Sequence, residues 1–175
     1  MRLVFGAGGT GGHIFPALAV ADEIKERFPK ADILFIGARG KMEMERVPKA
    51  GYAIKGLWIS GLLGKSLGAK IMTLIKLMHS ILKSYFILRK YKPNAVVGFG
   101  GFASGPALLT AHWIGIPTMI QEQNSYPGLT NRMLGNRVNR ICTAYAEAKK
   151  FFPDKKVVLL GNPVRRNLGQ KSGSK

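Results

Sequence analysis

The sequence predicts an α/β fold, a Rossmann-like parallel sheet with helices on both faces. Short apolar runs alternate along the chain with patterns typical of helices. The runs are apolar throughout, as is typical of parallel strands that are buried on both faces. At 175 residues, of which 46% are hydrophobic, the chain is long enough to bury the core of one domain. This composition excludes a disordered chain.

The expected elements follow from hydrophobic periodicity and from the positions of proline. Strands are expected at residues 2–5, 32–36, 95–99, 117–121, 139–144 and 156–160, with a weaker one at 52–59. The first helix should carry Pro16 in its first turn and end before Pro29. Its expected inner face consists of Leu18, Ala21, Ile24 and Phe28. Further helices are expected from Pro106 to Ile114, from near Pro127, and over residues 146–152.

Residues 69–90 have the pattern of an amphipathic helix. One face should carry Ile71, Leu74, Ile75, Met78, Leu82, Tyr85 and Phe86, and the opposite face Lys76, Ser80 and Lys83. For the second half of this helix we expect the apolar stripe to be core. Near the first half, basic and apolar residues lie close together without any acid, as at a membrane surface: Lys65, Lys70, Ile71, Ile75 and Lys76.

The charge balance indicates an anionic partner. The chain has 27 Lys and Arg residues against 9 Asp and Glu, a formal net charge of +18, which suits a nucleic acid or an anionic membrane. No segment is expected to span a membrane, because the longest stretch without charged residues, 93–121, contains Pro106 and Pro117. The single cysteine, Cys142, is expected to be a buried strand residue, and the lack of a recognisable signal peptide indicates the cytoplasm.

A glycine-rich loop, GAGGTGGHIFP at residues 6–16, follows the first strand. Bare amides at the start of a helix favour an anion, typically a diphosphate. The G-x-G-x-x-G pattern also matches the dinucleotide fingerprint, but the second strand ends without the acid that binds NAD; Arg39 leaves NADP open. The loop ends at His13, which either makes local hydrogen bonds or serves as a base.

Two further loops follow later strands. Residues 98–106, GFGGFASGP, open a helix, and residues 121–128 place Glu122 and Asn124 just beyond the next strand. Either residue has a structural alternative, since Glu122 could cap the following helix and Asn124 could make a turn. Because parallel strands end at the same edge, we expect the three loops to share one site.

Four motifs in order, GGTGGHIFPALAVA, GFGGFASGP, QEQNSYPGLTNR and LLGNPVR, closely resemble those of the MurG family over residues 1–166. The resemblance implies the N-terminal half of an inverting glycosyltransferase with the GT-B fold. Such an enzyme moves GlcNAc from UDP-GlcNAc to the C4 hydroxyl of MurNAc in lipid I, undecaprenyl-pyrophosphoryl-MurNAc-pentapeptide, giving lipid II for peptidoglycan. It also implies a peripheral enzyme at the cytoplasmic face of the cell membrane.

The resemblance also assigns site residues. His13 and Glu122 correspond to the catalytic candidates. The donor UDP-GlcNAc would contact Thr10, Gly11, Gly12, Asn124 and Arg165. The second loop, with Gly101, Phe102, Ser104 and Gly105, would bind acceptor or phosphate. Neither a metal nor a cofactor is implied. Gln121 stands where the family commonly has histidine, and Phe102 where it often has tyrosine.

The resemblance divides the chain into an N-terminal acceptor-binding domain, residues 1–166, and a polar tail, 167–175. The family's C-terminal donor-binding domain is expected to be missing, so little catalysis is expected from this chain alone. The alternatives are a basic nucleic-acid-binding module or, third, an NADP-dependent reductase. No nucleic acid is expected, because the aromatic residues are scattered rather than interleaved with arginines.

Overall fold

A computed structural model describes residues 1–61 and 67–164. Its centre is a seven-stranded sheet in the order β3-β2-β1-β4-β5-β6-β7, in which every neighbouring pair is parallel. The strands are β1 (Arg2–Ala7), β2 (Asp32–Ala38), β3 (Ala53–Leu57), β4 (Ala95–Gly100), β5 (Thr118–Glu122), β6 (Arg140–Thr143) and β7 (Val157–Leu159). All seven expected strands are confirmed, including the weaker one, which forms β3 at the edge.

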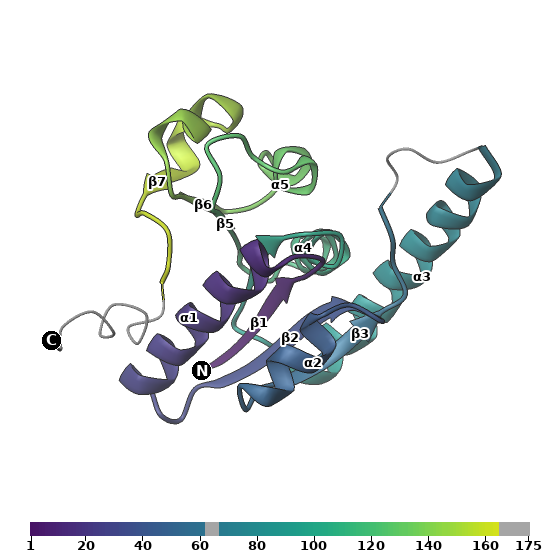
Figure 1. Ribbon diagram of the computed structural model, residues 1–175, viewed down its shortest axis with the longest axis horizontal. Helices are drawn as coiled ribbons and strands as arrows, with labels where there is room; N and C mark the ends of the chain where they lie inside the picture. Colours follow the sequence, from purple (N-terminus) through teal and green to yellow (C-terminus); the bar gives the residue numbers. More distant parts are fainter. Residues whose placement is uncertain (62–66, 165–175) are drawn as a thin grey trace, which may run out of the picture.

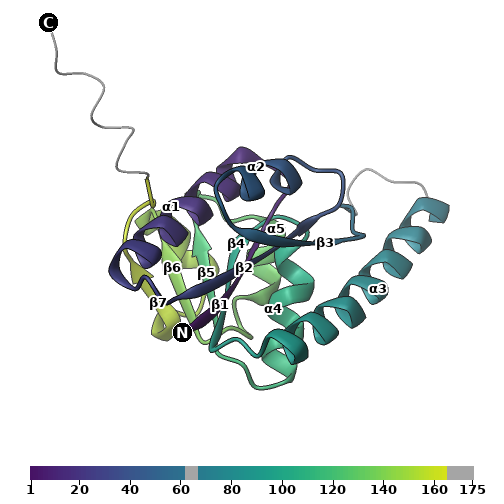
Figure 2. The same cartoon turned by 90° about the horizontal axis from the view of Figure 1, so that it is seen from below.

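Helices cover both faces of the sheet (Figures 1 and 2). They are α1 (Gly11–Arg27), α2 (Glu43–Lys49), α3 (Leu67–Tyr91), α4 (Ser104–Trp113) and α5 (Leu129–Leu134), with 3₁₀ turns η1 (Ala146–Phe151) and η2 (Asp154–Lys156). Side chains of α1 and α2 pack on one face of the sheet, and side chains of α3, α4 and α5 on the other. The predicted Rossmann-like architecture is therefore confirmed.

The two cores follow from the alternation of side chains along each strand. In β1, Val4 faces the core under α3 and α4, whereas Leu3 and Phe5 face the core under α1. Phe5 lies between Phe35 and Phe99, with ring centroids 5.5 and 5.1 Å apart, so aromatic rings from β1, β2 and β4 join the three central strands.

The first helix ends at Arg27, before Pro29 as predicted, but it differs from its prediction at its start and in one residue of its inner face. It begins at Gly11 rather than near Pro16, which lies inside the helix, and Phe28 is a 57% exposed residue at its end instead of a core residue. Helix α2 was not expected at all, since Pro48 and charged residues obscure its pattern. The short helix at 146–152 exists as a 3₁₀ turn.

Helix α3 turns its apolar stripe outward. Its buried positions are Thr73, Ser80, Ser84 and Leu88. The residues of the stripe are exposed, with exposed fractions between 38% at Tyr85 and 62% at Phe86. The expectation that the second half of the stripe is core is therefore wrong. Small polar side chains let the helix approach the sheet closely, and Ser80 donates a hydrogen bond to the carbonyl of Trp58 (3.0 Å).

The same helix qualifies by length and hydropathy alone as a membrane span. Residues 71–91 have a mean hydropathy of 1.4, so the expectation that no segment qualifies is wrong by this criterion. Within the domain, however, α3 is bonded to its neighbours. Lys83 Nζ donates to the carbonyl of Gly56 (2.7 Å), and burial, with Arg39 and Lys55 nearby, lowers the pKa of Lys83. The N-terminal half of α3 projects beyond the rest of the domain (Figures 1 and 2).

The order of the strands changes direction between β1 and β4. From β1 the chain adds β2 and β3 on one side of the sheet, and then β4 to β7 on the other side. In open α/β sheets, such a point is the crevice in which ligands bind. The loops after β1 and β4 touch there: Gly101 has a φ of +81°, and a β-carbon at this position would overlap the carbonyl oxygen of Gly8. Only glycine at residue 101 permits this contact, so the backbones of the two loops pack directly against each other.

Gly101→Ala should therefore destabilise the domain more than an alanine at another glycine with positive φ. Gly115 (φ +75°) is the matched control, because a β-carbon there would meet nothing within 4 Å. We expect Gly115→Ala to lower the free energy of unfolding by about 1 kcal/mol and Gly101→Ala by at least about 2 kcal/mol more. Urea unfolding measures both, and equal losses would contradict the close contact.

Candidate active site

The candidate site lies at the carboxyl edge of the sheet, where the loops after β1, β4 and β5 begin. As predicted, all three glycine- or polar-rich loops follow parallel strands that end at this edge. The first is residues 8–10, the second residues 101–103, and the third residues 123–128. The first two loops flank the β1/β4 crevice, and the third lies one strand further along the sheet.

The first glycine loop is fastened by a buried glutamate that the sequence did not point to. Glu43, at the start of α2, is 0% exposed. Its carboxylate accepts hydrogen bonds from the amide of Gly9 (3.2 Å to each oxygen) and from the amide of Ala38 (2.9 Å to Oε1). Within the loop, the Gly9 amide thus already serves an internal anion, so the diphosphate predicted for this loop would have to use other amides.

The buried position of the Glu43 side chain depends on two glycines. A β-carbon on Gly8 would overlap Oε1 of Glu43, and one on Gly37 would lie 2.5 Å from its Cγ. Gly8 directly follows β1, and Gly37 is the next-to-last residue of the adjacent strand β2. The sequence did contain a signal for this buried acid: glycines at the ends of two neighbouring strands, Gly8 and Gly37, followed by Glu43 in the next helix. It can be recognised only when the register of the two strands is known.

His13 lies in the first turn of α1 and is half-buried. Its Nδ1 is 3.2 Å from the carbonyl oxygen of Gly8 and 3.1 Å from the hydroxyl of Thr10. The other edge of the ring lies against Gly100, where an added β-carbon would be 2.6 Å from Cδ2 and 2.7 Å from Nε2. The ring is thus oriented by Nδ1, with Nε2 on the side of the β4 loop.

The second loop combines an anchored turn with an exposed aromatic ring. Ser104, which is buried, donates from its hydroxyl to the carbonyl of Gly101 (2.9 Å). Phe102 is 45% exposed and contacts Gly61, where any β-carbon would overlap its ring. Gly105 lies in the first turn of α4, close to Thr130.

The third loop is organised by Glu122, which is 1% exposed. One oxygen accepts from the backbone and side-chain amides of Asn124 (2.9 and 3.0 Å), and the other from the Gly128 amide (3.2 Å) and Asn131 Nδ2 (2.9 Å). Asn124 itself is exposed, so the buried carboxylate presents it at the edge. The structural alternatives raised from the sequence were a Glu122 that caps the following helix and a turn at Asn124. Glu122 does accept the amide of Gly128, the residue that precedes α5, as well as the two amides of Asn124.

The structure places the predicted site residues in two groups. Thr10, Gly11, Gly12 and His13 lie at the start of α1, beside the loop of Gly101, Phe102, Ser104 and Gly105. Glu122 and Asn124 lie at the end of β5. Arg165 and Lys65 are outside the described residues, and the side chain of Lys70 is not described. Gln121 is buried, with its amide 3.4 Å from the carbonyl of Gly161.

The structure also locates the potential metal ligands and the single cysteine. Within residues 1–61 and 67–164, no group of three or more His, Cys, Asp and Glu side chains is placed to hold a metal ion. Cys142 is a buried strand residue, as predicted, and burial raises the pKa of its thiol, which disfavours the nucleophilic thiolate.

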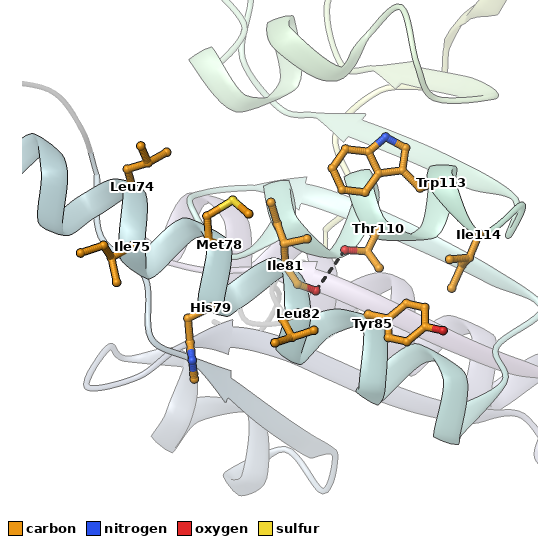
Figure 3. A pocket seen from close by; sticks show the side chains of 10 residues that line it. All are labelled: Leu74, Ile75, Met78, His79, Ile81, Leu82, Tyr85, Thr110, Trp113 and Ile114. Carbon is orange, nitrogen blue, oxygen red and sulfur yellow. Dashed lines mark hydrogen bonds between the residues drawn. The ribbon is translucent and has the colours of Figure 1, made fainter.

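A second surface feature is an apolar groove between α3 and α4, with a volume of about 730 Å³ (Figure 3). Met78, Leu82 and Tyr85 of α3 face Trp113, the last residue of α4, and Ile114, which follows it, across the groove. The helices are joined at its floor by a hydrogen bond from the Thr110 hydroxyl to the carbonyl of Ile81 (3.4 Å). Trp113 is 61% exposed, so the groove and the outer stripe of α3 form one continuous apolar surface.

Comparison with known proteins identifies relatives over nearly the whole chain. The Glycosyltransferase family 28 N-terminal domain matches residues 3–143. A UDP-N-acetylglucosamine–N-acetylmuramyl-(pentapeptide) pyrophosphoryl-undecaprenol N-acetylglucosamine transferase of Christiangramia forsetii is 55% identical over 169 residues, covering 96% of this chain and 46% of that protein. The Bacteroides fragilis protein of the same name is 52% identical over 168 residues, 96% of this chain and 44% of that one.

Solved structures of similar fold also match nearly the whole chain. The crystal structure of Acinetobacter baumannii MurG has a TM-score of 0.75 at 28% identity, covering 94% of this chain and 46% of that one. A UDP-GlcNAc 2-epimerase of Neisseria meningitidis bound to UDP-GlcNAc shares the fold, with a TM-score of 0.68 at 16% identity over 93% of this chain and 46% of that one. The chain therefore spans about half the length of the curated relatives it matches.

Glu122→Gln should destabilise the domain, because an amide NH₂ group would then face backbone N–H donors that cannot turn away. We expect a loss of about 1–3 kcal/mol in the free energy of unfolding, measured with urea. Glu147→Gln is the matched control at an exposed glutamate and should change little. Equal stability of the two variants would show that the four hydrogen bonds contribute nothing.

Proposed function

The chain belongs to glycosyltransferase family 28, whose N-terminal domain it contains, and we propose that it is the acceptor-binding half of an N-acetylglucosaminyltransferase. In this proposal GlcNAc passes from UDP-GlcNAc to the C4 hydroxyl of MurNAc in lipid I, and lipid II is the product. The names of relatives at 50% to 55% identity support both substrates and the reaction. The donor site would be completed by the part of the relatives that this chain does not match.

The observation that carries the proposal is the place of His13 at the contact between the β1 and β4 loops. Nδ1 is occupied by the Gly8 carbonyl and the Thr10 hydroxyl, so Nε2 is the ring nitrogen left to meet a substrate. Nε2 would take the proton of the C4 hydroxyl while the hydroxyl oxygen forms a bond to the anomeric carbon of GlcNAc. The bond from that carbon to UDP breaks, and UDP leaves with the electron pair.

The remaining site residues have supporting roles in the proposal. The first-turn amides of Gly11 and Gly12, with Thr10, would stabilise the charge that develops on the leaving diphosphate. Asn124 would contact the donor, and Arg165, which lies outside the described residues, would pair with its phosphates. Glu122 would act by holding Asn124 in place, since its own oxygens already accept four hydrogen bonds.

We further propose that the domain binds the cytoplasmic face of the membrane peripherally. An acceptor with an undecaprenyl chain lies in the bilayer, so its enzyme must reach the interface. The exposed stripe of α3 and the groove beside Trp113 offer apolar surface for insertion. Basic residues would add about 1 kcal/mol each near an anionic surface. Of the basic residues predicted for this role, Lys76 lies on the face of α3 opposite the stripe, with its ammonium group over the Trp58 ring (5.1 Å).

His13→Ala should lower kcat by about 10²–10⁴-fold when the chain is joined to the C-terminal part of its Christiangramia forsetii relative. His112→Ala, which removes an exposed histidine of α4, is the matched control and should retain activity. Steady-state kinetics with UDP-GlcNAc and a lipid I analogue measure the effect. Full activity of His13→Ala would remove the histidine from the chemistry, and a rise in donor KM alone would assign it to a phosphate contact.

Met78→Gln with Phe86→Gln should reduce binding to vesicles that contain anionic lipid by about tenfold or more, because two exposed apolar side chains are lost from the inserting face. Met133→Gln with Leu160→Gln is the matched pair, with 64% and 68% exposed side chains away from α3. Co-sedimentation measures the binding, which high salt should weaken. Equal binding of both pairs, or tight salt-dependent binding to random DNA without vesicle binding, would contradict the proposal.

A further inference from the structure

One peptide group lies between the buried carboxylate of Glu43 and the ring of His13. The peptide joins Gly8 to Gly9. Its N–H, on Gly9, donates to both oxygens of Glu43 at 3.2 Å, and its carbonyl oxygen, on Gly8, lies 3.2 Å from Nδ1 of His13. The three groups therefore form a continuous chain of hydrogen bonds from the carboxylate to the imidazole.

We propose that Glu43 is a positioning residue that acts on His13 through this peptide, holding the ring proton on Nδ1 and leaving the lone pair on Nε2. A carbonyl oxygen only accepts hydrogen bonds, so its contact with Nδ1 requires the proton to be there. The neutral ring then has its acceptor at Nε2, the atom that the proposed reaction needs. In this last respect the inference rests on the proposed function.

The carboxylate makes the carbonyl a stronger partner. Hydrogen bonds that share a peptide polarise one another, and an anion that accepts from the N–H pushes electron density onto the carbonyl oxygen. The effect is largest where water is excluded, and Glu43 is 0% exposed. A carboxylate that touches a histidine directly fixes its tautomer in many enzyme sites; here the carboxylate acts at a distance of one peptide.

The backbone around the relay leaves it little freedom. Gly101 packs against the carbonyl oxygen of Gly8, and Gly100 packs against the Nε2 edge of His13. On the other side, Ala38 anchors the carboxylate with a 2.9 Å hydrogen bond from β2. The peptide between Gly8 and Gly9 is thus held from both faces, so its N–H and carbonyl keep their directions.

The hydroxyl of Thr10 offers a competing arrangement. It lies 3.1 Å from the same Nδ1 and can donate to that atom if the proton moves to Nε2. The hydroxyl can also turn and accept, whereas the carbonyl can only accept. The arrangement with Nδ1–H therefore satisfies both neighbours, and the arrangement with Nε2–H leaves the Gly8 carbonyl opposite a lone pair.

The tautomer is measurable without any reaction. In the ¹⁵N-labelled 175-residue chain, ring nitrogen chemical shifts and long-range ¹H–¹⁵N couplings report where each neutral imidazole carries its proton. The chain has three histidines, and the exposed His79 and His112 serve as internal references. We expect His13 to be the Nδ1–H form, in contrast to the Nε2–H form that a free histidine side chain prefers.

Glu43→Gln tests the role of the charge, because glutamine keeps an acceptor oxygen for Gly9 and Ala38 and loses the anion. We expect the ratio of Nδ1–H to Nε2–H at His13 to fall by about threefold or more. Glu45→Gln is the matched control: it removes the same charge from α2, where Glu45 is exposed and pairs with Lys49, and should leave the ratio unchanged. An Nε2–H tautomer in the wild-type chain, or equal ratios in the two variants, would overturn the inference.

If Glu43→Gln does not fold, Thr10→Val decides. The hydroxyl of this exposed residue is the other neighbour of Nδ1, so its removal leaves the Gly8 carbonyl, held by Glu43 through the peptide, as the partner that orients the ring. The Nδ1–H form should persist, and its loss would overturn the inference. Failure of the proposed function gives a different result: His13→Ala would be active in the joined enzyme while the wild-type tautomer and its dependence on Glu43 remained as expected.

Discussion

The contact between the backbone of Gly101 and the carbonyl of Gly8 is the constraint on which the candidate site depends. It joins the ends of β1 and β4 at the point where the order of the sheet reverses. It also fixes the carbonyl to which His13 is oriented, and it closes one side of the peptide that Glu43 holds from the other. A β-carbon on Gly101 would overlap the Gly8 carbonyl and separate the loops, and one on Gly8 would displace the carboxylate of Glu43. The abundance of glycine here therefore serves contact within the protein as much as contact with a ligand.

The sequence predicted the sheet well because its strands are short apolar runs bounded by turn residues. All seven were identified, and the location of the three loops at the carboxyl edge of the sheet followed from the parallel pairing of the strands. Helices were less predictable where two signals conflicted. Pro16 suggested a helix start, yet the helix begins at Gly11, a residue with poor helix propensity, and Pro16 lies inside it.

Contacts between distant segments account for what the sequence did not predict. Glu43 resembles any surface glutamate until the registers of β1 and β2 place Gly8 and Gly37 beside it. The stripe on α3 was located correctly in its pattern and wrongly in its direction, because periodicity identifies two faces without saying which one meets the sheet. The small side chains of Thr73, Ser80 and Ser84 decide that question here, since they permit close approach to the domain.

Helix α3 also affects how the domain unfolds in water. Its apolar stripe, which includes Ile71, Met78 and Phe86, is in contact with solvent before unfolding begins. Unfolding therefore hydrates less new apolar surface in this helix than in a helix of the same length that buries its stripe. The heat capacity change of unfolding is correspondingly smaller, and the curve of stability against temperature is flatter, than for a domain of equal size with a conventional covering helix.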